Sequence, residues 1–545
     1  MVDASSLFKE FKGVKMVQYL NNNNSGFAAW NANRNATVAT KPKSRLGSFL
    51  WWLILFMGTW WLISMWTAPN DKPAPTDSDI AIVATDNIEM PAHEIVGDKI
   101  KANVRGLRVS KISLADYAAN SKKDDDTRVT LLPADTDFAE VGLTATGTTA
   151  PDVKTVWKEQ DGKMVWRNSD GVVFTRDVKI DGYLITVTDT IENKTNRDLT
   201  FAPYARMVRV GHETAAGVST GVITNTNSKV RYNDWTALDK KSYAYSTTNG
   251  FFGFSDQYWQ TIAEIKSPDQ TMRAKSVEDK YMTDATAAGV VVTPGNTGVF
   301  TTTIYAGPRD QVILDAAATT IPGIDKTIDY GWFWFFAEPL LWLLNILNSF
   351  VMNYGVAIIL LTILLRLLMW PLTRKSYVSS ITMQKMQPEL QRIQKLYAND
   401  KMRLQMEMMN LYKTHKTSPM SGCLPMLLQI PIFFALYKAL LISVNMRNAG
   451  FLWISDLAAM DPYFILPILM GATMWWQQRL QSGQTKTDKN ANNIAASTGR
   501  VMKWLPFIFT IMFAWMPAGL VLYWTVSNLF GILQTYIIKK QLAKK

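Results

Sequence analysis

One arginine, Arg366, lies inside an aliphatic stretch that otherwise has the composition of a membrane span, AIILLTILLRLLMWPLTRK at residues 357–375. Placing an arginine at the centre of a bilayer helix costs about 2.5–3.5 kcal/mol on insertion scales. Arg374 marks the polar end of this stretch, and along a helix it lies about 12 Å from Arg366. A snorkelling arginine side chain reaches roughly half that distance. The guanidinium of Arg366 therefore needs water or polar partners within the membrane.

The obvious partner for this charge is a buried carboxylate, but the segments that we expect to span the membrane contain no Asp or Glu. This composition argues against a carboxylate proton relay and against an intramembrane ion pair. Uncharged polar side chains remain, and Thr362 lies one turn before Arg366 on the same helix face. Further polar candidates in the predicted spans are Gln429, Tyr523, Thr525, Ser527 and Asn528. Taken singly, the threonine, serine and asparagine could instead form hydrogen bonds between helices.

If these side chains converge, they would form a wet, positively charged groove that is open to the cytoplasm. Such a groove would lower the cost of holding polar or acidic peptide partway into the bilayer while an apolar segment passes into lipid. This physics is what an insertase needs. The alternative function is a transporter or channel for a small anion, which would require a path through to the outside. A membrane enzyme ranks third.

The rest of the sequence offers little for catalysis or metal binding. One cysteine, Cys423, and three histidines are too few for a disulfide framework or for a structural zinc or haem site. The acid–base pairs His93–Glu94 and His212–Glu213 do not converge by themselves, because neighbouring residues in a strand point to opposite faces. We therefore predict that the protein is not an enzyme and has no cofactor and no metal.

The elements that must position Arg366 are apolar segments of about 20 residues, the length that crosses about 30 Å of hydrocarbon. We predict spans at 47–67, 351–373, 421–442 and 462–478, and two more within 501–538. The first span is too long for the apolar part of a signal peptide, so we expect an uncleaved anchor. A helix at 329–350 should lie in the outer interface, because aromatic side chains crowd its start.

Lysine and arginine residues set the predicted orientation. They are dense in four segments: 1–46, 374–420, 479–500 and 539–545. The loop 443–461 holds only Arg447, and Lys438 is expected to snorkel near the outer interface without a role of its own. By the positive-inside rule both termini are cytoplasmic and 68–328 lies outside. This orientation explains the net charge of +12, so we expect no direct binding of nucleic acid.

Residues 68–328 have the pattern of an antiparallel β-sandwich. Runs rich in Val, Thr, Ile and Tyr, such as YLITVTDTIEN and GVFTTTIYAG, alternate with turn sequences such as NSDG and TPGNTG. We expect a binding or spacing domain. Residues 1–46 have no sustained periodicity, and we expect them to be a mostly disordered cytoplasmic extension.

The predicted cytoplasmic segment 374–420 has helical spacing on both sides of ANDK, whose Asn and Asp suit a turn and a helix cap. We therefore predict a helical hairpin. Methionine-rich faces adapt to varied apolar partners, although the same methionines could instead pack the two helices together. The candidate partner contacts are Met383, Met386, Arg392, Met402, Met406 and Met409.

Residues 329–541 resemble the YidC family of membrane protein insertases, in its Gram-negative bacterial form. The motifs that carry the resemblance are DYGWFWF, LTILLRLLMWPLT, MQPELQRIQKLY, GCLPMLLQIPIFFALYKAL and PAGLVLYWTVSNL. The resemblance implies a core of five transmembrane helices plus an N-terminal anchor in the inner membrane, with a large periplasmic β-supersandwich. It also implies an insertase and chaperone for nascent membrane proteins. Such a protein works in the lipid bilayer, alone or beside the Sec translocon and its accessory subunits.

The resemblance assigns site residues as well. Arg366 is the intramembrane arginine, and the implied substrate contacts are Thr362, Gln429, Phe433, Tyr523 and Trp524. With Asn528 they make up the predicted substrate groove, while the hairpin 376–416 would meet the ribosome or targeting factors. The chain departs from the family at Trp524, where a second tyrosine is expected. That change keeps an aromatic ring and loses one hydroxyl.

Overall fold

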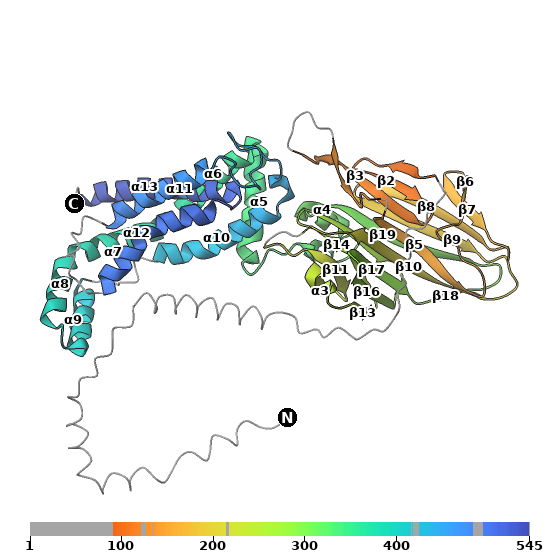
Figure 1. The fold of residues 1–545 in the computed structure, drawn as a ribbon, viewed down its shortest axis with the longest axis horizontal. Coiled ribbons are helices and arrows are strands. Elements are labelled where there is room, and N and C mark those ends of the chain that lie inside the picture. The colour runs from red at the N-terminus through yellow and green to blue at the C-terminus, as the bar shows by residue number, and fades with distance from the viewer. Residues whose placement is uncertain are drawn as a thin grey trace, which may run out of the picture. The chain divides into compact units, whose positions relative to one another are not determined.

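The structure, a computed structural model, describes residues 91–120, 127–134, 136–213, 217–415, 417, 424–482 and 494–543. The predicted extension 1–46 and the predicted anchor 47–67 lie outside the described residues. The described chain begins with a domain built almost entirely of strands and continues with helices (Figure 1).

The strands of the described residues form two antiparallel sheets. The first has the order β1-β2-β3-β5-β10-β17-β16-β13, with β4 on β3 and β18 on β10. Its strands are β1 (His93–Val96), β2 (Ile100–Arg105), β3 (Arg108–Ala118), β4 (Arg128–Leu131), β5 (Phe138–Thr146), β10 (Leu199–Val210), β13 (Tyr243–Thr247), β16 (Gln270–Val277), β17 (Lys280–Ala287) and β18 (Val290–Val292). The second sheet has the order β12-β11-β14-β15-β19-β9-β8-β7-β6. Its strands are β6 (Lys158–Gln160), β7 (Lys163–Arg167), β8 (Val173–Asp181), β9 (Leu184–Glu192), β11 (Gly221–Thr226), β12 (Lys229–Asn233), β14 (Gly250–Ser255), β15 (Trp259–Ile265) and β19 (Thr297–Pro308).

Alternating burial explains why these segments form strands. In β9 every second residue is buried, and Ile185 and Val187 join the shared core of the domain. All six residues of β14 are buried, because apolar residues of the segment that follows β19 join the same core. That segment contains α4 (Gln311–Ala317) and η2 (Ile324–Thr327). The antiparallel β-sandwich predicted from the sequence is confirmed.

A buried arginine connects the two sheets. Arg176 of β8 is paired with Asp189 of β9 at 2.8 Å, and both side chains are almost fully buried. The same guanidinium donates to the carbonyl oxygens of Gly106 and Val141, which belong to the region of the other sheet. Because a buried charge is tolerated only when it is paired and hydrogen-bonded, this network ties the sheets at a fixed register.

The longer helices of the described residues all follow residue 333. They are α5 (Trp334–Val351), α6 (Tyr354–Leu368), α7 (Trp370–Lys385), α8 (Gln387–Leu396), α9 (Lys401–Thr414), α10 (Leu424–Ile442), α11 (Ile465–Ser482), α12 (Ile494–Phe513) and α13 (Ala518–Ala543). Their shared core includes Leu361 of α6, Leu436 of α10, Met470 of α11 and Val521 of α13. A β-sandwich followed along the chain by an apolar helical core confirms the predicted fold class.

The helix that carries Arg366 ends in a sharp bend. α6 and α7 meet at 63° around Met369, and Pro371 is the second residue of α7. Proline lacks the N–H that would bond the carbonyl four residues earlier, and its ring clashes with that carbonyl. The predicted span 351–373 is therefore bent at Met369, and α7 continues beyond it to Lys385.

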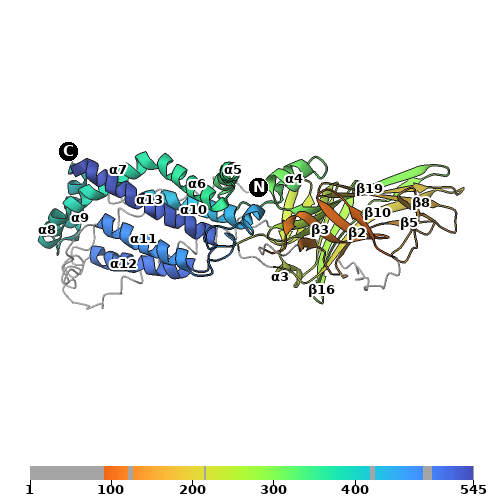
Figure 2. The same cartoon turned by 90° about the horizontal axis from the view of Figure 1, so that it is seen from above.

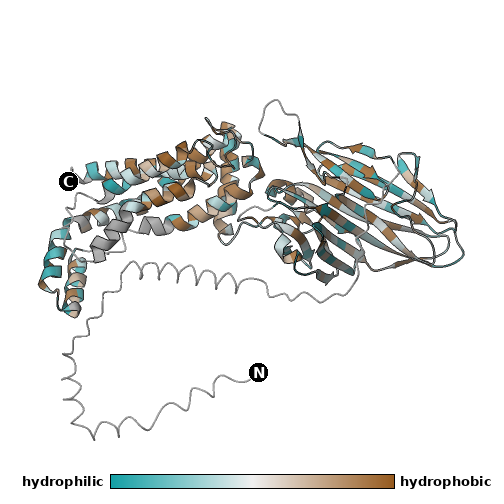
Figure 3. Cartoon of the chain, viewed as in Figure 1, coloured by the Kyte–Doolittle hydropathy of each residue, from teal (hydrophilic) through white to brown (hydrophobic). Residues whose placement is uncertain are grey.

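Two described helices are long and apolar enough to cross a membrane: Trp334–Val351, and Ala518–Gln541 within α13. The bent pair α6–α7 counts as a third if it is one span, and Gln429–Ile442 and Trp504–Phe513 are shorter apolar helices. Apolar residues colour most of these helices in Figure 3, whereas α8 is largely hydrophilic. The interfacial location of α5 stays a prediction.

The segment 374–420 contains two short helices after α7. α8 and α9 lie side by side beyond the end of α7 (Figures 1 and 2). Asp400 caps α9, because its carboxylate accepts a hydrogen bond from the N–H of Arg403 at 3.0 Å. ANDK therefore supplies the turn and the cap that its composition suggested.

Candidate functional site

Arg366 lies in the last turn of α6 and contacts α13. Its Nε donates to the hydroxyl of Ser527 at 2.8 Å, and its Nη2 bonds to the same oxygen. Its backbone carbonyl accepts a hydrogen bond from Gln534 at 3.3 Å. Among the described residues Arg366 forms no ion pair, so its contacts with α13 are made to uncharged groups.

Two further predicted residues meet beside this contact. Gln429 of α10 donates through Nε2 to the hydroxyl of Tyr523 on α13. Ser527 follows Tyr523 by four residues, so both lie on one face of α13. Arg366, Gln429, Tyr523 and Ser527 therefore gather where α6, α10 and α13 meet, and we call them the polar cluster.

An aromatic cluster lies beside the polar one. Phe433 of α10 meets Trp524 of α13 edge to face, with ring centroids 4.9 Å apart. Trp524 also contacts Phe513 at 5.1 Å and Phe509 at 5.8 Å, both on α12. Phe433 follows Gln429 by one helical turn and Trp524 follows Tyr523 directly, so both helices pass from the polar cluster to the aromatic cluster within one turn.

Two predicted groove residues have other partners. The hydroxyl of Thr362 is fully buried and donates to the carbonyl of Ile358 in its own helix at 2.6 Å. Asn528 is buried and donates toward Met470 and Thr473 of α11 at 3.4 Å. Both polar groups are thus used between or within helices, and their contact with substrate stays a prediction.

The residues predicted to contact cytoplasmic partners differ in their burial. Met386 is buried, and Met383 is half-buried. Of the remaining candidates, α8 exposes Arg392, and α9 exposes Met402, Met406 and Met409. Met386 therefore packs inside the protein, which was the alternative to a partner contact. The three methionines of α9 instead present an apolar surface that can adapt to a partner.

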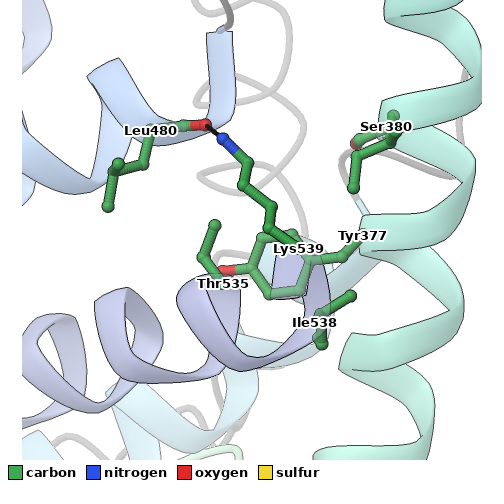
Figure 4. A pocket seen from close by; sticks show the side chains of 7 residues that line it. Tyr377, Ser380, Leu480, Thr535, Ile538 and Lys539 are labelled. Carbon is green, nitrogen blue, oxygen red and sulfur yellow. Dashed lines mark hydrogen bonds between the residues drawn. The ribbon is translucent and has the colours of Figure 1, made fainter. Parts of the chain in front are cut away.

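A small pocket lies further along α13, between that helix, α7 and α11 (Figure 4). Lys539 closes one side by donating to the carbonyl of Leu480 at 2.6 Å. Tyr377 and Thr535 line it as well. Its volume of about 10 Å³ is that of a single water, so it has no room for a peptide.

Lys438, for which we predicted no role of its own, has a defined partner. Its ammonium donates to the carbonyl of Gly217 at 2.8 Å and pairs with Asp329 at 3.1 Å. Asp329 also accepts hydrogen bonds from the hydroxyl of Ser219 and the N–H of Gly331, each at 2.8 Å. Burial raises the pKa of the Asp329 carboxyl, but the Lys438 charge and these hydrogen bonds lower it by more, so this pKa lies below its usual value.

Comparison with known proteins assigns the family. The model of the 60Kd inner membrane protein family matches residues 346–545, and that of the YidC periplasmic domain matches residues 96–343. The membrane protein insertase YidC of Beijerinckia indica is 31% identical over 522 residues, which cover 85% of this chain and 84% of the relative. The chain belongs to the YidC family of membrane protein insertases. The YidC of Aeromonas hydrophila is 38% identical over 390 residues, 69% of each chain.

A solved structure is also similar. A YidC insertase crystal structure with its first transmembrane domain resolved matches at a TM-score of 0.36 and 18% identity, over 82% of this chain and 94% of that one. The family assignment, made on sequence, confirms the predicted resemblance. It also confirms that the protein is not an enzyme, because YidC proteins are insertases. Membership makes the chain an integral membrane protein whose partners are membrane-protein clients and the lipid bilayer.

Proposed function

We propose that this protein is an insertase and chaperone that moves transmembrane segments of clients from the cytoplasm into the bacterial inner membrane, and that Arg366 attracts the acidic tails of short clients. Membership in the YidC family supports the class of function. One observation carries the role of Arg366: its guanidinium bonds to a hydroxyl and, among the described residues, to no carboxylate. Its charge is therefore available to an acidic peptide.

The two clusters would have different tasks during insertion. The polar cluster would form the wet wall of a groove, where the client's polar tail stays hydrated beside Arg366. The aromatic cluster would contact the apolar segment of the client as that segment passes into lipid, because aromatic rings suit both apolar and interfacial surroundings. The step from polar to aromatic within one turn of α10 and α13 supports this division.

The orientation and the larger partners belong to the same proposal. Both termini would be cytoplasmic, and the β-sandwich would be periplasmic, as the lysine and arginine distribution indicates. The hairpin would then reach the ribosome or targeting factors through Met402, Met406 and Met409, whose exposure on α9 supports a contact surface. The protein would act alone or beside the Sec translocon and its accessory subunits.

The test compares clients that differ only in tail charge. The full chain is reconstituted in lipid vesicles with a one-span client whose short tail carries either two aspartates or two lysines, and protease protection of the tail measures insertion. In water an attraction of about 1 kcal/mol at 4 Å becomes an equal repulsion in Arg366→Glu, so insertion of the acidic client should fall about thirtyfold. The acidic-to-basic insertion ratio should fall by more, because the basic client gains what the acidic client loses. Arg366→Lys, which keeps the charge, should retain most of the preference. Equal impairment of both clients by Arg366→Glu, which would leave the acidic-to-basic ratio unchanged, contradicts the attraction role.

A further inference from the structure

The side chain and the backbone of Arg366 are both held by α13. Ser527 binds the guanidinium, and Gln534 binds the carbonyl of the same residue. We infer that Ser527 is a positioning residue, which fixes the direction of the Arg366 charge for acidic clients. This inference deepens the proposed function and rests on it.

The contact has the geometry of a positioning group. Ser527 is only 3% exposed, so its hydroxyl has few competing water contacts. Two nitrogens of Arg366, Nε and Nη2, converge on its oxygen. A hydroxyl oxygen has two lone pairs, so it can accept both bonds. The pair fixes the plane of the guanidinium as well as its distance from α13.

The remaining donors of the guanidinium are left for a client. A guanidinium has five N–H donors in a rigid fork, and Ser527 takes only those on one edge. Arg366 is half-buried, and within the described residues its guanidinium bonds to Ser527 through Nε and Nη2. Nη1 is therefore the nitrogen that we assign to a client. A carboxylate arriving there would meet an oriented donor.

An uncharged residue at position 527 orients the Arg366 side chain better for client binding than a charged residue would. An aspartate at position 527 would neutralise Arg366 and compete with the client for it, whereas a hydroxyl orients the side chain and leaves its charge. Without Ser527 the long arginine side chain would spread over several rotamers, and binding would have to order it again.

Gln534 adds a second, independent point of attachment. Its side chain is fully buried and donates to the Arg366 carbonyl just before the 63° bend between α6 and α7. The Cα of Arg366 is thereby fixed relative to α13, so that Ser527 meets the guanidinium at a defined distance. Positioning of a functional side chain requires both ends to be held.

The test uses the full chain in lipid vesicles and a one-span client whose short tail is either acidic or, with Asn for Asp, neutral. Ser527→Ala should lower the acidic-to-neutral insertion ratio about tenfold, the size expected for a lost hydrogen bond to a charged group. Ser527→Thr, which keeps the hydroxyl, should restore the ratio. Thr535→Val is the matched control, because the buried Thr535 hydroxyl donates to the carbonyl of Gly531 in its own helix. That variant should leave the ratio unchanged.

A double variant separates positioning from packing. In an Arg366→Ala background, Ser527→Ala should cause no further change, because there is no guanidinium left to orient. The inference is overturned if Ser527→Ala lowers insertion of both clients equally in both backgrounds, or if the ratio survives the change. If Arg366→Ala itself leaves the ratio intact, the proposed role of the arginine fails and this inference fails with it.

Discussion

The pair Lys438–Asp329 gives a stability prediction that separates a structural charge from a snorkelling one. The proposed change is Lys438→Met, which keeps the length of the side chain and removes the ammonium. It leaves the Asp329 carboxylate with the hydroxyl of Ser219 and the N–H of Gly331. It also leaves the carbonyl of Gly217 without the lysine donor.

The magnitude follows from distance and exposure. Two unit charges at the observed 3.1 Å attract by about 1.3 kcal/mol in water and about 5 kcal/mol at an effective dielectric of 20. The Asp329 side chain is 39% exposed, so solvent screens the pair toward the lower value, while Lys438 is only 13% exposed. We expect Lys438→Met to cost about 1–2 kcal/mol, between the values for exposed and buried pairs.

Thermal unfolding of the full chain in detergent, followed by tryptophan fluorescence, measures this loss as a fall of about 1–2 °C in Tm. Lys99→Met is the control: it breaks an ion pair of similar length, Lys99–Asp116 at 2.9 Å, in which both side chains are more than 40% exposed. Solvent screens such an exposed pair, so we expect Lys99→Met to leave Tm unchanged.

The pH dependence has a definite sign. Because folding lowers the Asp329 pKa, the pair stabilises the protein fully above the unfolded-state value of about 4, and this stabilisation is lost as the pH falls through the folded-state pKa. The difference in Tm between the wild type and Lys438→Met should thus be constant from about pH 5 to 8 and shrink below about pH 4. A Tm unchanged by the substitution at neutral pH, or a difference that persists in acid, would refute the reasoning.

Three further predictions follow from single contacts. Arg176→Met leaves the buried carboxylate of Asp189 unpaired and should destabilise the β-sandwich by about 3–5 kcal/mol, measured by circular dichroism melting. Gly355→Ala should lower Tm, because a Cβ there would lie 2.2 Å from the ring of Phe451, and Phe451→Ala in the same chain should restore part of the loss. Met406→Ser, on an exposed face of α9, should leave the free energy of unfolding within about 0.5 kcal/mol of wild type while photocrosslinking of the hairpin to ribosomes falls.

The β-sandwich was predictable because its physical signal is local. A strand buried on one face shows a period of two in its own residues, as β9 does with Ile185 and Val187 inward. The burial of β14 on both faces was not predictable, since it depends on a segment that follows β19, far along the chain. Apolar helices were likewise evident from composition. The bend at Met369 could have been predicted from Pro371, because a proline inside a helical segment breaks or kinks it.

The site was predictable as a set of polar residues but not as a set of contacts. Ser527 and Asn528 are neighbours in sequence, and on a helix they point about 100° apart. Packing turns α13 so that Ser527 faces Arg366 and Asn528 faces α11. No property of either side chain reveals that choice. The available signal was the spacing of four between Tyr523 and Ser527, which places both on one face.

The arrangement also indicates how the proposed intramembrane charge of Arg366 would be supported. An arginine without a carboxylate partner is costly in lipid, and the cost falls if water and uncharged hydrogen-bonding groups surround it. Here α13 supplies a hydroxyl to the guanidinium and an amide to the backbone, and both come from side chains that are themselves buried. With α13 as polar support and the guanidinium donors that Ser527 does not occupy, the proposed site would be stable when empty and attractive to an anion. The same support from a carboxylate would stabilise the empty site more and leave less binding energy for the client, so an uncharged shell is the arrangement that the proposed insertion step favours.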